Sequence, residues 1–362
     1  MKLFQSLFIL FLIGCTNFTF AQKLSPGFDK NEFIELLKIG SRTTTDSSWY
    51  GNVKDPESAL IYQSKSTGFD NIWQLWMRKD SIPIISIRGT TKTEVSFLAN
   101  FYAAMVSAKG ALHLSDDFTF KYNLSEDPKA AVHIGYLISM AYLSGDIISK
   151  IDSLYQSGSK EFIIAGHSQG GAISYLLTSY LESLKNEGKL AKDIRFKSCI
   201  SAAPKPGNLF YAYTFEHLTQ GGWGYNVINT SDWVPEVPFS TQTIRDLNTL
   251  NPFTDAKHLI KKQKFPKKLF VKHLYNQLTK PSLKAQKKYQ RYLGKMASKF
   301  VRKSFPEFTP PEYFKSSDYV RTGLTIVLVP DKSYYEKYPQ NTTNVWLNHA
   351  QEPYTFLVEK MK

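Results

Sequence analysis

The sequence predicts an α/β fold with a mostly parallel central sheet flanked by helices and a basic helical insert. Short apolar runs of strand length alternate with longer segments in helical spacing, and strands in such alternation form parallel sheets. A glycine-rich turn, Ala165 to Gly171 (AGHSQGG), joins one apolar run directly to a helical segment. With 362 residues, of which 42% are hydrophobic and 14% aromatic, the chain is a globular protein with a large core.

The first half of the chain predicts two helices and two strands. Apolar residues recur at intervals of three or four in residues 28–40, which is typical of a helix with one buried face. Residues 72–76 and 82–87 are expected to be strands, and the second is so apolar that both of its faces should be buried. Residues 95–106 are expected to form an apolar helix, followed by a polar loop to Asp127.

The second half repeats the alternation. Long helical segments predict helices, and the apolar runs between them are short enough for strands. The predicted helices cover residues 129–154 and 169–185, and the predicted strands cover residues 161–165, 194–201, 226–229 and 324–329. In an open parallel sheet the functional groups gather at the carboxyl ends of the strands, where the Ala165–Gly171 turn also lies.

The N-terminus predicts export. Lys2 is followed by the apolar run 3–14, and Thr19-Phe20-Ala21 resembles a small-x-small cleavage site, so residues 1–21 are expected to be a signal peptide. A second interpretation remains open, because residues 12–15 resemble a lipobox in which Cys15 would carry a lipid. Both interpretations predict a protein that is secreted, periplasmic or associated with the envelope.

The positive charge is concentrated in one segment. Residues 257–303 hold sixteen Lys or Arg and no Asp or Glu, and without them the net charge of +14 becomes about −2. They lie in a predicted insert, about residues 239–318. Basic residues from Lys284 to Arg302 recur at helical spacing, beside an apolar face formed by Tyr289, Tyr292, Leu293, Met296 and Phe300. Such a helix either binds an anionic membrane surface or packs its apolar stripe on the body of the protein.

Ser168 is the candidate nucleophile. Its G-x-S-x-G turn between a strand and a helix matches a nucleophile elbow, in which small neighbours let the backbone turn sharply and expose the serine. A chance glycine turn would be the simpler explanation, so the elbow requires partners. A serine hydroxyl needs a base to take its proton, and the base needs an acid to orient it.

Asp232 and His349 are the candidate acid and base. Asp232 follows the strand-like run 226–229, and a proline-containing loop comes after it. His349 is the remaining histidine that follows both Ser168 and this acid outside the basic segment, which contains His258 and His273. The order Ser, Asp, His is the order that this elbow requires.

Two backbone groups are candidates for stabilising an oxyanion. The N–H of Gln169 directly follows Ser168 and opens a helix. Thr90 follows the apolar strand 82–87 and Gly89, which permits a close approach, so its N–H and hydroxyl can both donate hydrogen bonds.

Together these motifs resemble the class 3 (fungal-type) lipase family of the α/β-hydrolases. The resemblance adds residues 132–136, residues 202–208 and residues 349–354 to the segments already described, and spans roughly residues 30–360. It implies an α/β-hydrolase domain over residues 22–362. Within it, Ser168, Asp232 and His349 would be catalytic, Thr90 and Gln169 would form the oxyanion hole, and residues 91–127 would form the lid region. Gln169 departs from the usual leucine of the family, and the interval from Asp232 to His349 is enlarged by the insert.

The expected activity is hydrolysis of carboxylic esters of lipids through an acyl-enzyme. It requires neither a metal nor a cofactor. An esterase for soluble or feruloyl-type esters on the same fold is the first alternative, because the fold does not determine the substrate. A non-catalytic protein that binds membrane surfaces through Lys257–Lys303 is the second. Nucleic acid is not an expected partner for an exported hydrolase.

Overall fold

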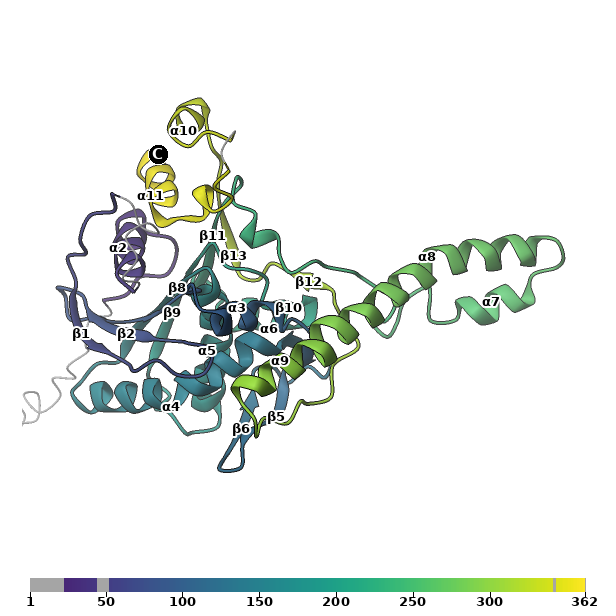
Figure 1. Cartoon of the computed structure of the whole chain (residues 1–362), viewed down its shortest axis with the longest axis horizontal. Coiled ribbons are helices and arrows are strands. Elements are labelled where there is room, and N and C mark those ends of the chain that lie inside the picture. Colours follow the sequence, from purple (N-terminus) through teal and green to yellow (C-terminus); the bar gives the residue numbers. More distant parts are fainter. Residues whose placement is uncertain (1–22, 44–51, 341–342, 362) are drawn as a thin grey trace, which may run out of the picture.

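The computed structural model describes residues 23–43, 52–340 and 343–361, and within them a seven-stranded sheet forms the centre of the molecule (Figure 1). The order of its strands is β1-β2-β3-β8-β9-β11-β13. Their bounds are β1 Ala59–Gln63, β2 Trp73–Met77, β3 Pro83–Ile87, β8 Glu161–His167, β9 Arg195–Ser201, β11 Gly224–Asn229 and β13 Leu324–Leu328. The five strands from β3 to β13 are parallel, and β1 and β2 add an antiparallel edge. The predicted signal peptide and Cys15 lie outside the described residues.

The sheet separates two hydrophobic clusters because successive side chains of a strand point to opposite faces. Ile85 and Ile164 pack with α4 (Ile134–Gln156) and α5 (Gln169–Asn186), whereas Ile84 and Ile163 pack with α2 (Lys30–Ser41) and α11 (Gln351–Lys360). The free Cys199 lies in the second cluster, where burial raises the pKa of its thiol to about 12. Helices therefore cover both faces, and the predicted mostly parallel sheet flanked by helices is confirmed.

Residues 94–133 differ from the prediction. Helix α3 covers only Glu94–Phe101, and the strand β4 (Met105–Ser107) begins within the end of the predicted helix 95–106. The expected polar loop contains the strands β5 Lys109–Ser115 and β6 Phe118–Asn123. Leu112, Leu114 and Phe120 are buried in the main core, while their strand neighbours His113, Ser115, Thr119 and Lys121 are polar. This two-residue alternation forms the β5–β6 hairpin, and the sequence interpretation mistook its polar positions for a loop. Most of the predicted lid region is therefore part of the body.

Short elements complete the body. The strands β4, β7 (Ala131–His133), β10 (Gly207–Asn208) and β12 (Tyr319–Val320) form a second small sheet. Its order is β12-β10-β7-β4. Further helices of the body are α6 Leu209–Leu218, η2 Val234–Glu236, α10 Lys332–Lys337 and η4 Leu347–His349.

The basic insert is helical, as predicted, and it divides into two parts. Helix α7 (Ala256–Lys262) and most of α8 (Lys267–Gln290) project from the body as a helical hairpin (Figure 1). The chain then continues through the π-helical segment η3 (Arg291–Met296) into α9 (Ala297–Ser304), which lies against the body. Val301 is fully buried there, and a Cβ on Gly294 would lie only 2.9 Å from the Cβ of Ala104. We call residues 256–288 the arm.

Candidate active site

Ser168 occupies the sharp turn between β8 and α5, with a φ of +59°. This left-handed conformation is strained for a serine and is typical of a nucleophile elbow. The adjacent glycines are required by packing: a Cβ on Gly170 would lie 2.1 Å from the carbonyl oxygen of Ile87, and one on Gly166 would lie 2.3 Å from that of Gly170. The glycine-rich sequence therefore permits β3, β8 and α5 to meet closely around the serine.

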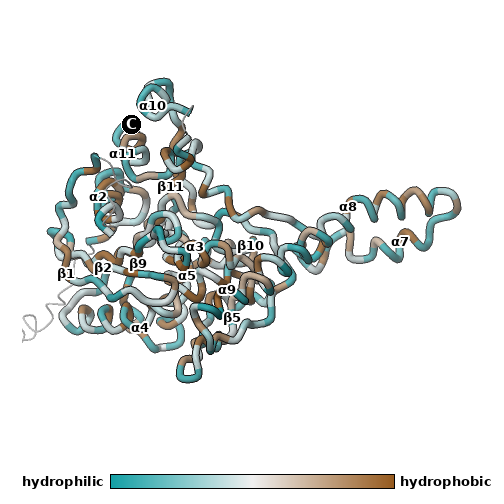
Figure 2. Tube along the Cα trace, in the orientation of Figure 1, coloured by the Kyte–Doolittle hydropathy of each residue, from teal (hydrophilic) through white to brown (hydrophobic). Residues whose placement is uncertain are grey.

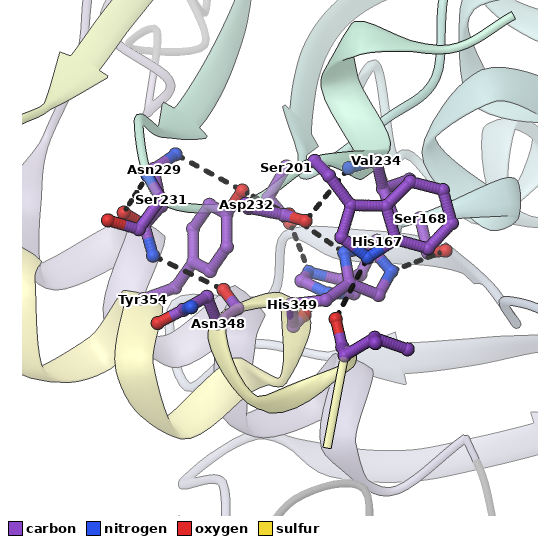
Figure 3. Close-up of polar contacts among 12 residues, drawn as sticks. His167, Ser168, Ser201, Asn229, Ser231, Asp232, Val234, Asn348, His349 and Tyr354 are labelled. Carbon is purple, nitrogen blue, oxygen red and sulfur yellow. Dashed lines mark hydrogen bonds and ion pairs between the residues drawn. The ribbon is translucent and has the colours of Figure 1, made fainter. Parts of the chain in front are cut away.

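The structure brings Ser168, His349 and Asp232 together, from the ends of β8, η4 and β11 (Figure 3). His349 Nε2 lies 2.8 Å from Ser168 Oγ, and His349 Nδ1 lies 2.8 Å from Asp232 Oδ2. A carboxylate accepts from N–H, so Nδ1 carries the proton and Nε2 is free to accept the hydroxyl proton of the serine. His258 and His273 lie on α7 and α8 in the arm.

Further hydrogen bonds hold the buried carboxylate of Asp232. Tyr354 donates its hydroxyl proton to Asp232 Oδ2 at 2.8 Å, and the backbone N–H of Val234 donates to Oδ1 at 3.0 Å. The Tyr354 oxygen also accepts from the backbone N–H of Asn229 at 3.1 Å. These donors orient the carboxylate toward His349 (Figure 3). Sequence reasoning missed Tyr354, although it lies within the matched residues 349–354.

His167 has a structural role that sequence reasoning also missed. Its Nε2–H donates to the carbonyl oxygen of His349 at 2.7 Å, and its Nδ1 accepts from Ser201 Oγ at 2.9 Å. Burial, with a smaller contribution from nearby His349, lowers the pKa of His167 to about 3, so the ring is neutral at ordinary pH. His167 thus fixes the backbone that carries His349. His167 occupies a position that the G-x-S-x-G pattern leaves unspecified, so the pattern did not predict this role.

The two oxyanion candidates border Ser168. Thr90 follows β3, and Gly89 beside it approaches the elbow so closely that a Cβ would lie 3.1 Å from the carbonyl oxygen of His167. Asp70 holds this loop by accepting hydrogen bonds from Arg88 at 3.0 Å and from Thr91 at 2.7 Å. Gln169 is the first residue of α5, where backbone N–H groups have no partner within the helix.

The side chain of Gln169 is buried and links the elbow to α3. Its amide nitrogen donates to the carbonyl oxygen of Ser96 and to Asn100 Oδ1, both at 3.0 Å. Asn100 in turn donates to Thr90 Oγ1 at 3.0 Å. The polar side chain that replaces the usual leucine therefore connects both oxyanion candidates to the helix above them.

An apolar cavity of about 320 Å³ opens at Ser168. Phe97 and Phe101 of α3 form one side, and Tyr289 and Leu293 of the insert contribute another part of the wall. The remaining lining includes the apolar residues Ala103, Pro204, Trp233, Val234, Val237, Pro238, Phe239 and Trp346. The predicted apolar face of the basic helix is therefore divided, because Tyr289 and Leu293 line the cavity whereas Tyr292, Met296 and Phe300 are exposed.

A cavity elsewhere on the molecule does not share this chemistry. It is larger, at about 620 Å³, is lined mainly by charged and polar residues, among them Glu32, Arg78 and Lys197, and includes none of the candidate residues. Across the described ranges, no group of three His, Cys, Asp or Glu side chains is arranged to hold a metal ion. A search of the same residues for a helix long and apolar enough to cross a membrane found none.

Comparisons with solved structures find several fungal lipases. The triacylglyceride lipase of Rhizomucor miehei is 17% identical over 59% of this chain and 77% of its own, with a TM-score of 0.43. Lipase II of Rhizopus niveus is 21% identical over 58% and 74%, with a TM-score of 0.43. The lipase of Rhizopus microsporus var. chinensis is 19% identical over 58% and 69%, with a TM-score of 0.42. No protein of curated function matches the sequence.

The sequence itself also matches a family model. The model is described as Lipase (class 3), and the match covers residues 84–242, from β3 through the elbow to the loop beyond Asp232. His349 and most of the basic insert lie outside the matched residues. The resemblance of this chain to the class 3 lipase family, first drawn from its motifs, is therefore confirmed over residues 84–242.

Proposed function

We propose that this protein is a serine hydrolase that cleaves carboxylic esters of lipids, most directly acylglycerols or phospholipids. The observation that carries the proposal is the hydrogen-bonded chain Ser168–His349–Asp232 at the mouth of an apolar cavity. The match to class 3 lipases supports hydrolysis of lipid esters. The roles of the individual residues are our proposal.

The chemistry follows from the geometry. Ser168 Oγ attacks the ester carbonyl carbon while His349 Nε2 takes its proton, and Asp232 stabilises the resulting imidazolium. The N–H of Gln169 and the N–H and hydroxyl of Thr90 donate to the oxygen that becomes negative. His349 then returns the proton to the leaving alcohol, which leaves an acyl-enzyme on Ser168. Water, deprotonated by His349, releases the acid and restores the serine.

The cavity supports the proposal that the protein binds the acyl chain of its substrate. Its aromatic and aliphatic lining offers an acyl chain extensive apolar contact, and burying each CH₂ contributes about 0.8 kcal/mol. Phe97 and Phe101 place α3 over the cavity, so α3 is the part of residues 91–127 to which we assign a lid role. We also propose that the protein is exported, on the sequence of residues 1–21 alone.

A substrate panel tests this proposal. Purified protein would be assayed on a short-chain soluble ester, a feruloyl ester, a long-chain triglyceride and a phospholipid. Faster hydrolysis of the long-chain lipids supports the proposal. Hydrolysis restricted to the soluble or feruloyl ester would replace it with the esterase alternative, and no hydrolysis of any ester would favour the non-catalytic surface-binding alternative.

The choice of base has its own test. His349→Ala should lose at least ~1,000-fold in kcat on a soluble ester, because Ser168 then has no group to accept its proton. His258→Ala and His273→Ala should retain full activity and serve as matched controls, because both residues lie in the arm. Loss of activity in either control, with His349→Ala still active, contradicts the assignment.

A further inference from the structure

We propose that the arm is a docking element for an anionic lipid surface. The end of the arm that lies farthest from the body contacts this surface, and the apolar helix face that the sequence predicted for this role does not. The proposal rests on the proposed lipid substrate for the choice of a lipid surface as the partner. Its physical basis is a set of apolar side chains that lie exposed to solvent among lysines in the folded protein.

The arm exposes large apolar side chains that a soluble helix would normally bury. Phe270, Leu274 and Leu278 are 68%, 48% and 69% exposed, and their spacing of four places them along one side of α8. Phe265 at the tip is 79% exposed. Leu259 of α7 and Leu269 of α8 are exposed as well. Figure 2 shows apolar positions interspersed with hydrophilic ones along the projecting hairpin of α7 and α8.

The charge around these side chains is of one sign. Residues 257–288 include eleven lysines and neither Asp nor Glu. The exposed Lys267, Lys268, Lys272 and Lys280 lie on α8 with the apolar side chains. Exposed lysines attract an anionic surface, and the apolar groups between them can enter the boundary between head groups and acyl chains.

This combination favours a lipid surface over other partners. A second copy of the chain would bring two strongly positive arms together, which is repulsive. A nucleic acid would neutralise the lysines but leave Phe265, Phe270 and Leu278 in water. An anionic lipid surface satisfies the charges and covers the apolar side chains at the same time.

Helix α8 also connects the arm to the cavity. Its 24 residues end at Gln290, next to Tyr289 in the cavity wall. At about 1.5 Å per residue the helix reaches ~36 Å from the cavity wall to the tip. The rim of the cavity exposes Phe101 and Phe239. One continuous helix thus links a surface-binding tip to the site where we expect an acyl chain.

The test measures binding of the Ser168→Ala protein to vesicles, so that its outcome is independent of catalysis. Vesicles of phosphatidylglycerol with phosphatidylcholine would be compared with pure phosphatidylcholine by sedimentation, at low and high salt. We expect binding to the anionic vesicles that is at least ~10-fold tighter than to the neutral ones and that weakens with salt.

Two arm variants separate the contributions. Lys267→Glu, Lys268→Glu, Lys272→Glu and Lys280→Glu together should weaken binding by ~100-fold or more. Phe270→Ser, Leu274→Ser and Leu278→Ser together should weaken it by ~10-fold or more and leave the remainder highly salt-sensitive. Both variants should keep wild-type activity on a soluble ester when Ser168 is present, and an unchanged circular dichroism spectrum.

The matched control changes the same number of charges on the body. Lys295→Glu, Lys299→Glu, Arg302→Glu and Lys303→Glu lie in η3 and α9 and should weaken binding much less than the arm variant. Equal losses in both variants would mean that only net charge matters, which overturns the proposal. Equal binding to neutral and anionic vesicles overturns it too. The proposal is also overturned if the protein binds duplex DNA more tightly than the anionic vesicles and the variant with Phe270, Leu274 and Leu278 changed to Ser binds the DNA equally well. Failure here with intact ester hydrolysis would leave the proposed function standing.

Discussion

At the scale of single residues, the carboxylate of Asp232 is held by more donors than His349 alone. Tyr354 donates to the same oxygen that accepts from His349, and Val234 N–H occupies the other oxygen. A carboxylate with fixed orientation keeps the imidazole in the tautomer that can accept the serine proton. His167 anchors the backbone of His349 by donating a hydrogen bond to its carbonyl oxygen. We therefore treat Tyr354 and His167 as positioning residues.

Replacing Tyr354 by Phe tests the positioning role. The change removes one hydrogen bond to Asp232 and leaves the buried N–H of Asn229 without its acceptor. We expect kcat on a soluble ester to fall by roughly tenfold with KM nearly unchanged, and stability to fall by about 1–3 kcal/mol. Tyr338→Phe is the control, because that hydroxyl donates to Glu352 away from Asp232. Unchanged kcat in Tyr354→Phe contradicts the role.

At the scale of elements, the insert contributes to the body as well as to the arm. Helix α8 ends and η3 begins at the cavity, so Tyr289 and Leu293 form part of the wall that we expect an acyl chain to contact. Helix α3 closes another side with Phe97 and Phe101. The largest acyl group that the cavity accepts is therefore expected to depend on the insert, most of which lies outside the residues that match the family model.

Enlarging Leu293 tests this dependence. Leu293→Trp should fill part of the cavity and lower kcat/KM for long acyl chains about tenfold more than for acetyl or butyryl esters. Met296→Trp lies in the same π-helical segment but is absent from the lining, so it should leave the chain-length profile unchanged. A uniform loss for all chain lengths in Leu293→Trp would indicate a general packing defect instead.

At the scale of the whole molecule, two buried histidines link stability to pH. Burial lowers the pKa of His133, which caps α4, and of His167 to about 3, from an ordinary value of 6.5. Between these values the unfolded chain binds protons that the folded protein does not. Their contribution to stability is therefore fully present above about pH 6.5 and is lost as the pH falls toward 3.

Urea unfolding at several pH values measures this linkage. The free energy of unfolding should fall from pH 7 to pH 5, and His133→Asn should reduce the slope by up to ~1.4 kcal/mol per pH unit while keeping a good helix cap. If His133→Asn and wild type show the same slope, His133 does not contribute to the pH dependence of stability.

Local sequence patterns predicted the parts of the fold that depend on neighbouring residues. The run from β8 through Ser168 to α5 combines an apolar strand, obligatory glycines and a helical period, so it was predictable. Asp232 and His349 were located by chain order, and the structure brings both to Ser168. Tyr354 and His167 were missed because their partners are contacts distant in sequence. The basic segment predicted a helix, but nothing local distinguished the part that packs from the part that projects.

Reaction with a serine-directed phosphonate tests the central proposal most directly. The probe should label wild-type protein at one position, Ser168, identified by peptide mass spectrometry, and should abolish ester hydrolysis in proportion to labelling. Ser168→Ala should be unlabelled and lose activity by several orders of magnitude with its circular dichroism spectrum intact. Labelling at another serine, or an active Ser168→Ala protein, would contradict the account.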